Sequence, residues 1–390
     1  MSPPPPPPPP PLRRQRLTLP PPPVAERLQG ALLGLWLGDL LGSALAGKTF
    51  PPVPEFPTLY TKPQALGPPR PYSREPSLAL GFAACAAYAF LNSRQFHLGN
   101  LLGAYRQHAA FLLYAGKLAP LSPPEEEGPA LPSLEPALAR ALEAFPRFHS
   151  PEAFLEQSLR GPATSPVLDG VLLRSVPAAC FFYEDSLARV QAVAKEALAT
   201  QTGPLGALAG IALAALVAQC ILSAHAYAPA AELLEAMQRD MAQAAPLLAH
   251  MGLNPAAIGQ ALSLLDEDMA YAQKDSPNLY APALNLRLHA GQLRVSFRLA
   301  LWELFHAPEA SAGGGPACII EDAVHRGGSP PTQGALVAAL CGARWGKGCL
   351  PAPPGLSPPS PLPPKPPQRH SCGDASFLVA LGEAVVAKRP

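Results

Sequence analysis

Proline is the residue that most restricts how this chain can fold. The chain contains 54 prolines among 390 residues, which is about 14% against a usual share of about 5%. Because proline has a fixed φ and no backbone N–H, a run of prolines continues neither a helix nor a sheet. Many of these prolines gather in three stretches, 3–23, 51–76 and 351–367. Long ordered segments therefore have to lie between these stretches.

The first stretch holds Pro3–Pro11 without interruption and is followed by Arg13, Arg14 and Arg16. Consecutive prolines favour an extended polyproline II conformation, so residues 1–23 are predicted to form a disordered, basic arm. This arm could solubilise the chain, or it could dock into a proline-binding groove or onto an anionic surface. No apolar segment follows the arginines, which argues against a secretory signal.

The other two stretches divide the rest of the chain. Residues 51–76 separate two helical patterns and are predicted to form a long loop inside one domain that spans residues 24–350. Residues 351–370 are predicted to be a disordered proline-rich linker. Residues 371–390 are then expected to carry a short helix, from about Ser376 to Lys388.

Between the proline-rich stretches, apolar residues recur at intervals of three and four, which is the spacing of one face of an α-helix. Ala and Leu, both strong helix formers, dominate these segments. No segment alternates with a period of two in residues typical of strands, so the residues predict an all-α fold. The predicted helices cover Ala25–Leu45, Ser77–Ser93, Gly99–Ala115, Leu134–Phe145, Pro151–Leu159, Asp169–Ala179, Ser186–Thr200, Leu205–Ala226, Ala228–His250, Pro255–Tyr271, Leu284–Leu304, Pro316–His325 and Pro331–Trp345.

One segment raises the alternative of a membrane span. Leu205–Ala224 has no formal charge, and about 20 apolar residues suffice to cross a bilayer. Gly206 and Gly210 also have the small-residue spacing found where membrane helices meet. The segment lacks Lys or Arg flanks, contains Gln219, and has no second span beside it. We therefore interpret it as a helix buried at the centre of a soluble bundle, with membrane insertion as the alternative.

Charge and cysteine content bear on partners and compartment. The chain has 29 basic and 28 acidic residues, a net charge of +1, which provides no field that would favour nucleic acid. The seven cysteines are widely spaced and include no CxxC pair. This pattern predicts reduced, mostly buried thiols and a cytoplasmic protein, without a disulfide framework or a zinc site.

Four landmarks then follow one another in order along the chain. They are Leu28–Gly42 (LQGALLGLWLGDLLG), Ser77–Leu80 (SLAL), Gly170–Pro177 (GVLLRSVP) and His325–Ala335 (HRGGSPPTQGA). Together they resemble the ADP-ribosylglycohydrolases, whose opening helix ends in Gly-Asp-Ala-Leu-Gly and whose middle part carries Gly-x-x-x-Arg-x-x-Pro. The resemblance implies an all-α, orthogonal multi-helix bundle of that type, with the proline-rich segments as extensions.

The same resemblance implies where metal ions would be expected. The family uses two magnesium or manganese ions, held by an early Thr-Asp-Asp-Thr and a late Gly-Gly-Asp-x-Asp-Thr. This chain has Arg74–Ser77 (REPS) and Gly327–Thr332 (GGSPPT) at these places, so none of the four aspartates is present. Divalent ions need several anionic oxygens, and an inward arginine would repel them. We therefore expect that the two-metal site is lost and that no cofactor is bound.

Two further family features are altered. A Thr-His pair before the central helix is Thr200-Gln201 here, and glutamine cannot take up a proton near neutral pH as imidazole can. The acidic residue that often follows Gly-Asp-Ala-Leu-Gly is also missing. The residues left at cleft positions are Asp39, Glu75, Arg174, Gly327, Gly328 and Thr332.

Each of these residues also has a purely structural interpretation. Asp39 could line the pocket or cap a neighbouring helix. Arg174 could contact a phosphate or pair with a nearby acid such as Glu184 or Asp185.

Gly327 and Gly328 could let the backbone approach a diphosphate, or they could simply form a tight turn. A Gly-Gly pair directly before a helix more often forms a tight turn. The diphosphate contact rests on the resemblance to the family alone.

The altered motifs lead to a hypothesis about function. The chain is expected to be a non-catalytic binding or regulatory protein, with a protein partner or an ADP-ribose-like ligand in the old cleft, and with no nucleic acid or membrane partner. The alternative is an active hydrolase of ADP-ribosyl or related N-glycosidic bonds, with a site rebuilt from Glu75, Asp39 and Thr332.

Overall fold

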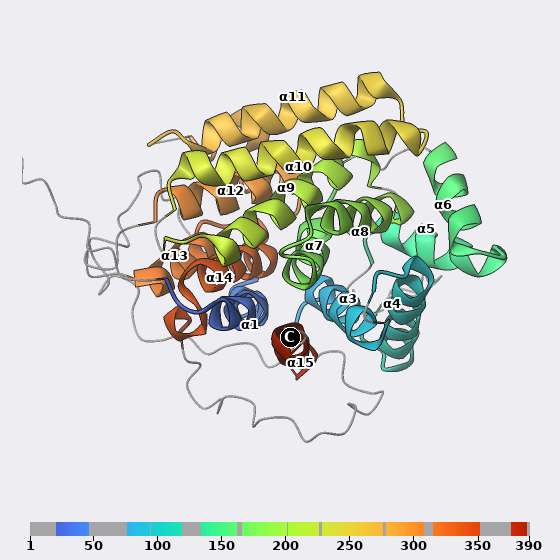
Figure 1. Ribbon diagram of the computed structural model, residues 1–390, viewed down its shortest axis with the longest axis horizontal. Coiled ribbons are helices and arrows are strands. Elements are labelled where there is room, and N and C mark those ends of the chain that lie inside the picture. The colour runs from blue at the N-terminus through green and yellow to red at the C-terminus, as the bar shows by residue number, and fades with distance from the viewer. Residues whose placement is uncertain are drawn as a thin grey trace, which may run out of the picture.

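The computed structural model describes residues 21–46, 76–93, 95–118, 134–161, 166–200, 202–225, 228–275, 278–307, 315–351 and 376–387. Most of the basic arm, most of the 51–76 loop and most of the linker lie outside these residues. The helices are α1 (Val24–Ser43), α3 (Leu78–Ser93), α4 (Leu98–Tyr114), α5 (Pro136–Ala144), α6 (Pro151–Arg160), α7 (Gly170–Phe181), α8 (Ser186–Ala199), α9 (Gly203–Leu222), α10 (Ala230–His250), α11 (Pro255–Ala272), α12 (Leu293–Phe305), α13 (Gly315–His325), α14 (Pro330–Trp345) and α15 (Ser376–Ala387) (Figure 1).

This architecture confirms the predicted all-α fold. Short 3-10 turns cover Phe145–Arg147, Pro282–Leu284 and Lys347–Cys349. The only β-type pairing within the described ranges is the isolated bridge between Leu168 and Gln292. Most predicted helix ends agree with the observed ones to within two residues, because the apolar period and the proline or serine caps mark them locally.

Two helix ends differ from the prediction. Helix α12 begins at Leu293, nine residues after the predicted start at Leu284. The intervening residues form turns, in which the Asn285 side chain accepts hydrogen bonds from the backbone N–H groups of Arg287 and Leu288 and Gly291 has a φ of 78°. Such local side-chain bonds compete with a helix.

Helix α9 ends at Leu222, four residues before the predicted end at Ala226. Ser223 turns out of the helix with a ψ of 134°, and its carbonyl oxygen accepts a hydrogen bond of 2.7 Å from Arg27. A partner from α1, distant in sequence, therefore ends this helix.

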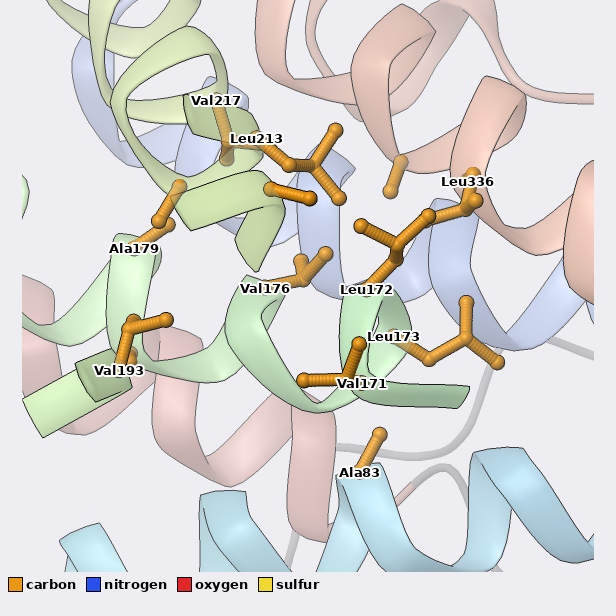
Figure 2. Close-up of a cluster of buried hydrophobic side chains, with 14 of the residues drawn as sticks. Ala83, Val171, Leu172, Leu173, Val176, Ala179, Val193, Leu213, Val217 and Leu336 are labelled. Carbon is orange, nitrogen blue, oxygen red and sulfur yellow. The ribbon is translucent and has the colours of Figure 1, made fainter. Parts of the chain in front are cut away.

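The core forms around α7 and α9, which are packed against each other and are covered by α3, α8, α10 and α14. Figure 2 shows Leu172 and Val176 of α7 pointing toward Leu213 of α9 and Leu336 of α14. Cys85, Cys180 and Cys220 are buried in this interior as free thiols, as predicted.

Helix α9 is the segment that raised the membrane alternative. Within the described part of the chain it is the one helix long and apolar enough to cross a bilayer, with a mean hydropathy of 2.3. However, 83% of its most apolar window is buried inside the protein. Its apolar surface is therefore covered by other helices, which is consistent with a soluble protein.

Helices α1 and α14 pack antiparallel at very short range. Gly30, Gly34, Gly38 and Gly42 occupy every fourth position of α1, and they face the backbone of Gly342, Ala338, Gly334 and Pro330 of α14. A Cβ atom at Gly34 would lie 2.2 Å from the Ala338 carbonyl oxygen, and one at Gly38 would lie 2.0 Å from that of Gly334. Only glycine allows this approach, and we call the contact the α1–α14 seam.

A Gly34→Ala substitution should therefore destabilise the fold. We expect it to reduce the free energy of unfolding by about 2 kcal/mol or more, because the added methyl forces two backbones apart. The control is Gly259→Ala in α11, where a Cβ would have no neighbour within 4 Å. That change should stabilise the protein by about 0.5–1 kcal/mol, since alanine favours helix. Urea denaturation measures the free energy of unfolding of both variants. Equal changes in the two variants would contradict the close packing of α1 against α14.

Candidate functional site

The predicted cleft residues come from distant parts of the chain. Asp39 lies near the end of α1, Arg174 in α7, Thr332 in the first turn of α14, and Gly327 and Gly328 in the turn between α13 and α14. Two other positions of the altered motifs, Glu75 and Gln201, lie outside the described residues.

Asp39 holds the beginning of α3. Its side chain is fully buried and accepts a 2.8 Å hydrogen bond from the backbone N–H of Ser77 and a second bond from the Ser77 hydroxyl. The Ser77 oxygen in turn accepts a hydrogen bond from Leu80 N–H. Burial raises the pKa of Asp39 to about 6, although the Ser77 bonds oppose this. This geometry corresponds to the helix-capping interpretation of Asp39.

Thr332 belongs to a cluster that sequence reasoning missed. Its hydroxyl donates to the Asp169 carboxylate at 3.4 Å, and Ser329 donates to the Thr332 oxygen at 3.1 Å. From α12, the Ser296 hydroxyl donates to Asp169 at 2.7 Å. Burial raises the pKa of Asp169 to about 7; the Ser296 bond lowers it, and the Glu135 charge raises it. We call Asp169, Ser296, Ser329 and Thr332 the Asp169 cluster.

A weak signal for Asp169 was present in the sequence. The residue directly precedes Gly170, the first glycine of the middle landmark, and it stands where a predicted helix begins. Its partner Ser296, however, lies 127 residues away along the chain. Nothing in the local pattern around Ser296 distinguishes it from an ordinary helical serine.

Arg174 is also held by carboxylates, but not by the two considered from the sequence. Its guanidinium donates to Glu196 at 2.7 Å and to Glu135 at 3.3 Å. Asp185 instead caps α8, and Glu184 is exposed. The two carboxylates raise the pKa of Arg174 against a strong opposing effect of burial. The pairing with acids that the sequence favoured is thus present with other partners, and the alternative contact with a phosphate is untested.

Glu135 links this ion-pair group to the Asp169 cluster. A Cβ at Gly170 would lie 1.8 Å from a Glu135 carboxylate oxygen, so the absence of a side chain there makes room for Glu135. Glu135 also contributes to the raised pKa of Asp169. Arg174 and Thr332 therefore belong to neighbouring groups of polar side chains. Asp39 instead accepts its hydrogen bonds from Ser77.

Gly327 and Gly328 form the tight turn that leads into α14. Their φ angles are 89° and 84°, in the left-handed region that favours glycine. A Cβ at Gly328 would lie 2.7 Å from the Leu286 carbonyl oxygen and 2.5 Å from the amide nitrogen of Gln333. The turn thus meets the need for close backbone packing, and a contact with a diphosphate stays a prediction.

The donor set at these positions is poor in ionised oxygens. Within the ranges that the structure describes, no three His, Cys, Asp or Glu side chains lie together so that they could hold a metal ion. Pro330 and Pro331 occupy the first turn of α14. The Thr332 hydroxyl is already hydrogen-bonded to a carboxylate.

The raised pKa of Asp169 predicts a pH effect on stability. A carboxyl that titrates at about 7 in the fold but near 3.8 in the unfolded chain stabilises the fold while protonated, and this contribution is lost as the pH rises. From about pH 4 to 7, the unfolding free energy of the wild type should fall by about 3 kcal/mol relative to Asp169→Asn. Denaturation at a series of pH values measures this, and parallel curves would contradict it.

Arg174 should be essential for stability. Replacing it by leucine leaves Glu196 buried without a counter-charge, so Arg174→Leu is expected to cost about 3–5 kcal/mol. The control is Arg239→Leu, because the Arg239 side chain is 60% exposed and lies 3.8 Å from Asp240; this pair should contribute about 1 kcal/mol or less. Similar losses in urea denaturation for both variants would argue against the ion-pair group.

Comparisons with known proteins agree with this fold. A solved structure described as "ADP-ribosylglycohydrolase-related protein complex" superposes with a TM-score of 0.55, covering 93% of this chain and 98% of that chain. At 20% sequence identity, this similarity shows the fold alone. No curated protein matches the sequence. The model of the ADP-ribosylglycohydrolase family, however, matches residues 20–354. The chain therefore belongs to the ADP-ribosylglycohydrolase family.

Proposed function

We propose that this chain is a non-catalytic member of the family that binds a ligand or a protein partner in the old cleft. One observation carries the proposal: at the late motif, Thr332 is bonded into the Asp169 cluster. A threonine that serves a divalent ion directs an oxygen lone pair at the ion. Here the Thr332 oxygen accepts a hydrogen bond from the Ser329 hydroxyl, and the Thr332 hydroxyl donates a hydrogen bond to the Asp169 carboxylate.

The charge of the cluster supports the same proposal. Two divalent ions bring four positive charges, which several ionised carboxylates have to offset. Burial raises the pKa of Asp39 to about 6 and that of Asp169 to about 7. Within the described residues, no three His, Cys, Asp or Glu side chains lie together so that they could hold a metal ion, which supports a member of the family without the pair of divalent ions.

The ligand is expected to be one that hydroxyl and carboxyl groups recognise. Buried hydroxyls and a protonatable carboxyl hydrogen-bond to other hydroxyls and to amides, as an ADP-ribose-like ligand or a polar peptide would offer. The net charge of +1 supports neither a nucleic-acid nor a membrane-surface partner. A cytoplasmic location is part of this proposal.

A second candidate function is a hydrolase with a rebuilt site. The observation that favours it is Asp169 itself, because a buried carboxyl with a pKa near neutrality suits a general acid or base. The sequence-based version of this candidate used Glu75, Asp39 and Thr332. Activity that is lost in Glu75→Gln or Asp169→Asn would support the hydrolase.

A thermal unfolding scan with ADP-ribose, with magnesium or manganese, and with both together tests the proposal. A true ligand at about 100 times its Kd stabilises a fold by about 2.7 kcal/mol, so we expect a rise in Tm with ADP-ribose that the metal does not change. The rise should be smaller in Thr332→Val and unchanged in Ser150→Ala, which removes only the cap of α6.

The companion measurement is the release of ADP-ribose from modified arginine. We expect none above the buffer rate. Release that a chelator abolishes would overturn the proposal in favour of a metal-dependent enzyme. If no ligand changes the Tm, the ADP-ribose part of the proposal is wrong. A protein partner in the cleft is then the remaining form of the proposal, and a binding assay tests it.

A further inference from the structure

The C-terminal helix α15 is placed unlike the other helices. It lies beyond residue 354, where the family match ends, and residues 352–375 connect it to the rest of the chain. Figure 1 shows α15 between α1 and α3, with its axis toward the viewer. It packs against α1, α3 and α7.

The contact is made by one side of α15. Leu381 is fully buried and Val385 is 6% exposed, and these residues lie one helical turn apart. Between them, Gly382 lies close to Gln29 and Leu32 of α1. Glu383 and Ala387, in contrast, are exposed. Leu381 and Val385 thus seat α15 in a groove, which we define as the surface of α1, α3 and α7 beneath it.

The helix depends on this groove for its order. α15 has 12 residues, and isolated helices shorter than about 12–15 residues are marginal in water. Its formation is thus coupled to docking. α15 follows all the other helices along the chain, so its undocking breaks no connection between two of them.

Docking of α15 also bears on the spacing of α1 and α3. Each of these two helices contacts α15 more extensively than it contacts the other. Their direct polar link is the pair of hydrogen bonds from Ser77 to Asp39. The residues that connect α1 to α3 also include the early motif at 74–77. A helix that packs against both α1 and α3 therefore bears on the spacing that this connection has to span.

We propose that residues 376–387 are a tethered ligand of the α1–α3–α7 groove, which docks and undocks as a unit while the body stays folded. When docked, α15 sets the position of α1 relative to α3 and so holds the Asp39–Ser77 link. Undocking frees the groove for a helix that presents the same apolar spacing. This inference does not depend on the activity or ligand of the cleft.

Amide hydrogen exchange on the full-length protein, followed by mass spectrometry, tests the proposal. Amides of 376–387 are expected to exchange at least tenfold more slowly than an unstructured peptide, but at least 100-fold faster than those of α9. Exchange at the rate of α9 would show that α15 opens only when the whole fold opens. Exchange at the unstructured rate would show that it is not docked. Either result overturns the proposal.

Two matched variants of the full chain test the coupling. Leu381→Asp places a carboxylate in the buried contact, whereas Ala387→Asp places one at an exposed position of the same helix. Leu381→Asp should speed exchange in 376–387 and in the start of α3 by tenfold or more and leave α9 unchanged; Ala387→Asp should change neither region. Faster exchange of α9 in Leu381→Asp, or an unchanged α3, would overturn the coupling.

Discussion

The short-range packing of α1 on α14 is the constraint on which the rest of this structure depends. Four glycines at every fourth position of α1 bring the two backbones together along the whole seam. Because Gly42 meets Pro330, the end of α1 is fixed against the beginning of α14, so the Asp39 and Thr332 ends of these helices lie at one end of the bundle. A larger residue anywhere along the seam would separate them.

Two buried arginines of the bundle are held by carboxylates. Arg174 lies among Glu135, Glu196 and Thr200, and Arg189 pairs with Asp240 at 2.6 Å. A buried charge needs such partners because burial without them is very costly. Hydroxyl groups likewise donate hydrogen bonds to the buried carboxyl groups of Asp169 and Asp39.

Much of the fold could be predicted from the sequence, but the candidate site could be predicted only in outline. Helix positions follow from a local property, the three-and-four spacing of apolar residues, and so they were mostly correct. The start of α12 was wrong because the side-chain bonds of Asn285 are invisible to that spacing. The predicted acidic partners of Arg174 were wrong because only acids close to it in sequence were considered. Its actual partners, Glu135 and Glu196, lie 39 and 22 residues away along the chain. Asp169 was missed because its significance arises from Ser296 and Thr332.

The all-α class, the order of the helices and the membership of the family follow from the amino-acid sequence, since they depend on periodicity and on short motifs. The roles of the buried polar residues follow from the packing of the helices instead. Whether Asp39 caps a helix, whether Arg174 is paired, and whether Thr332 is free are questions of which side chains meet across the bundle. These side-chain contacts depend on the packing of α1, α7, α12 and α14. No local sequence pattern reveals contacts between residues so far apart along the chain.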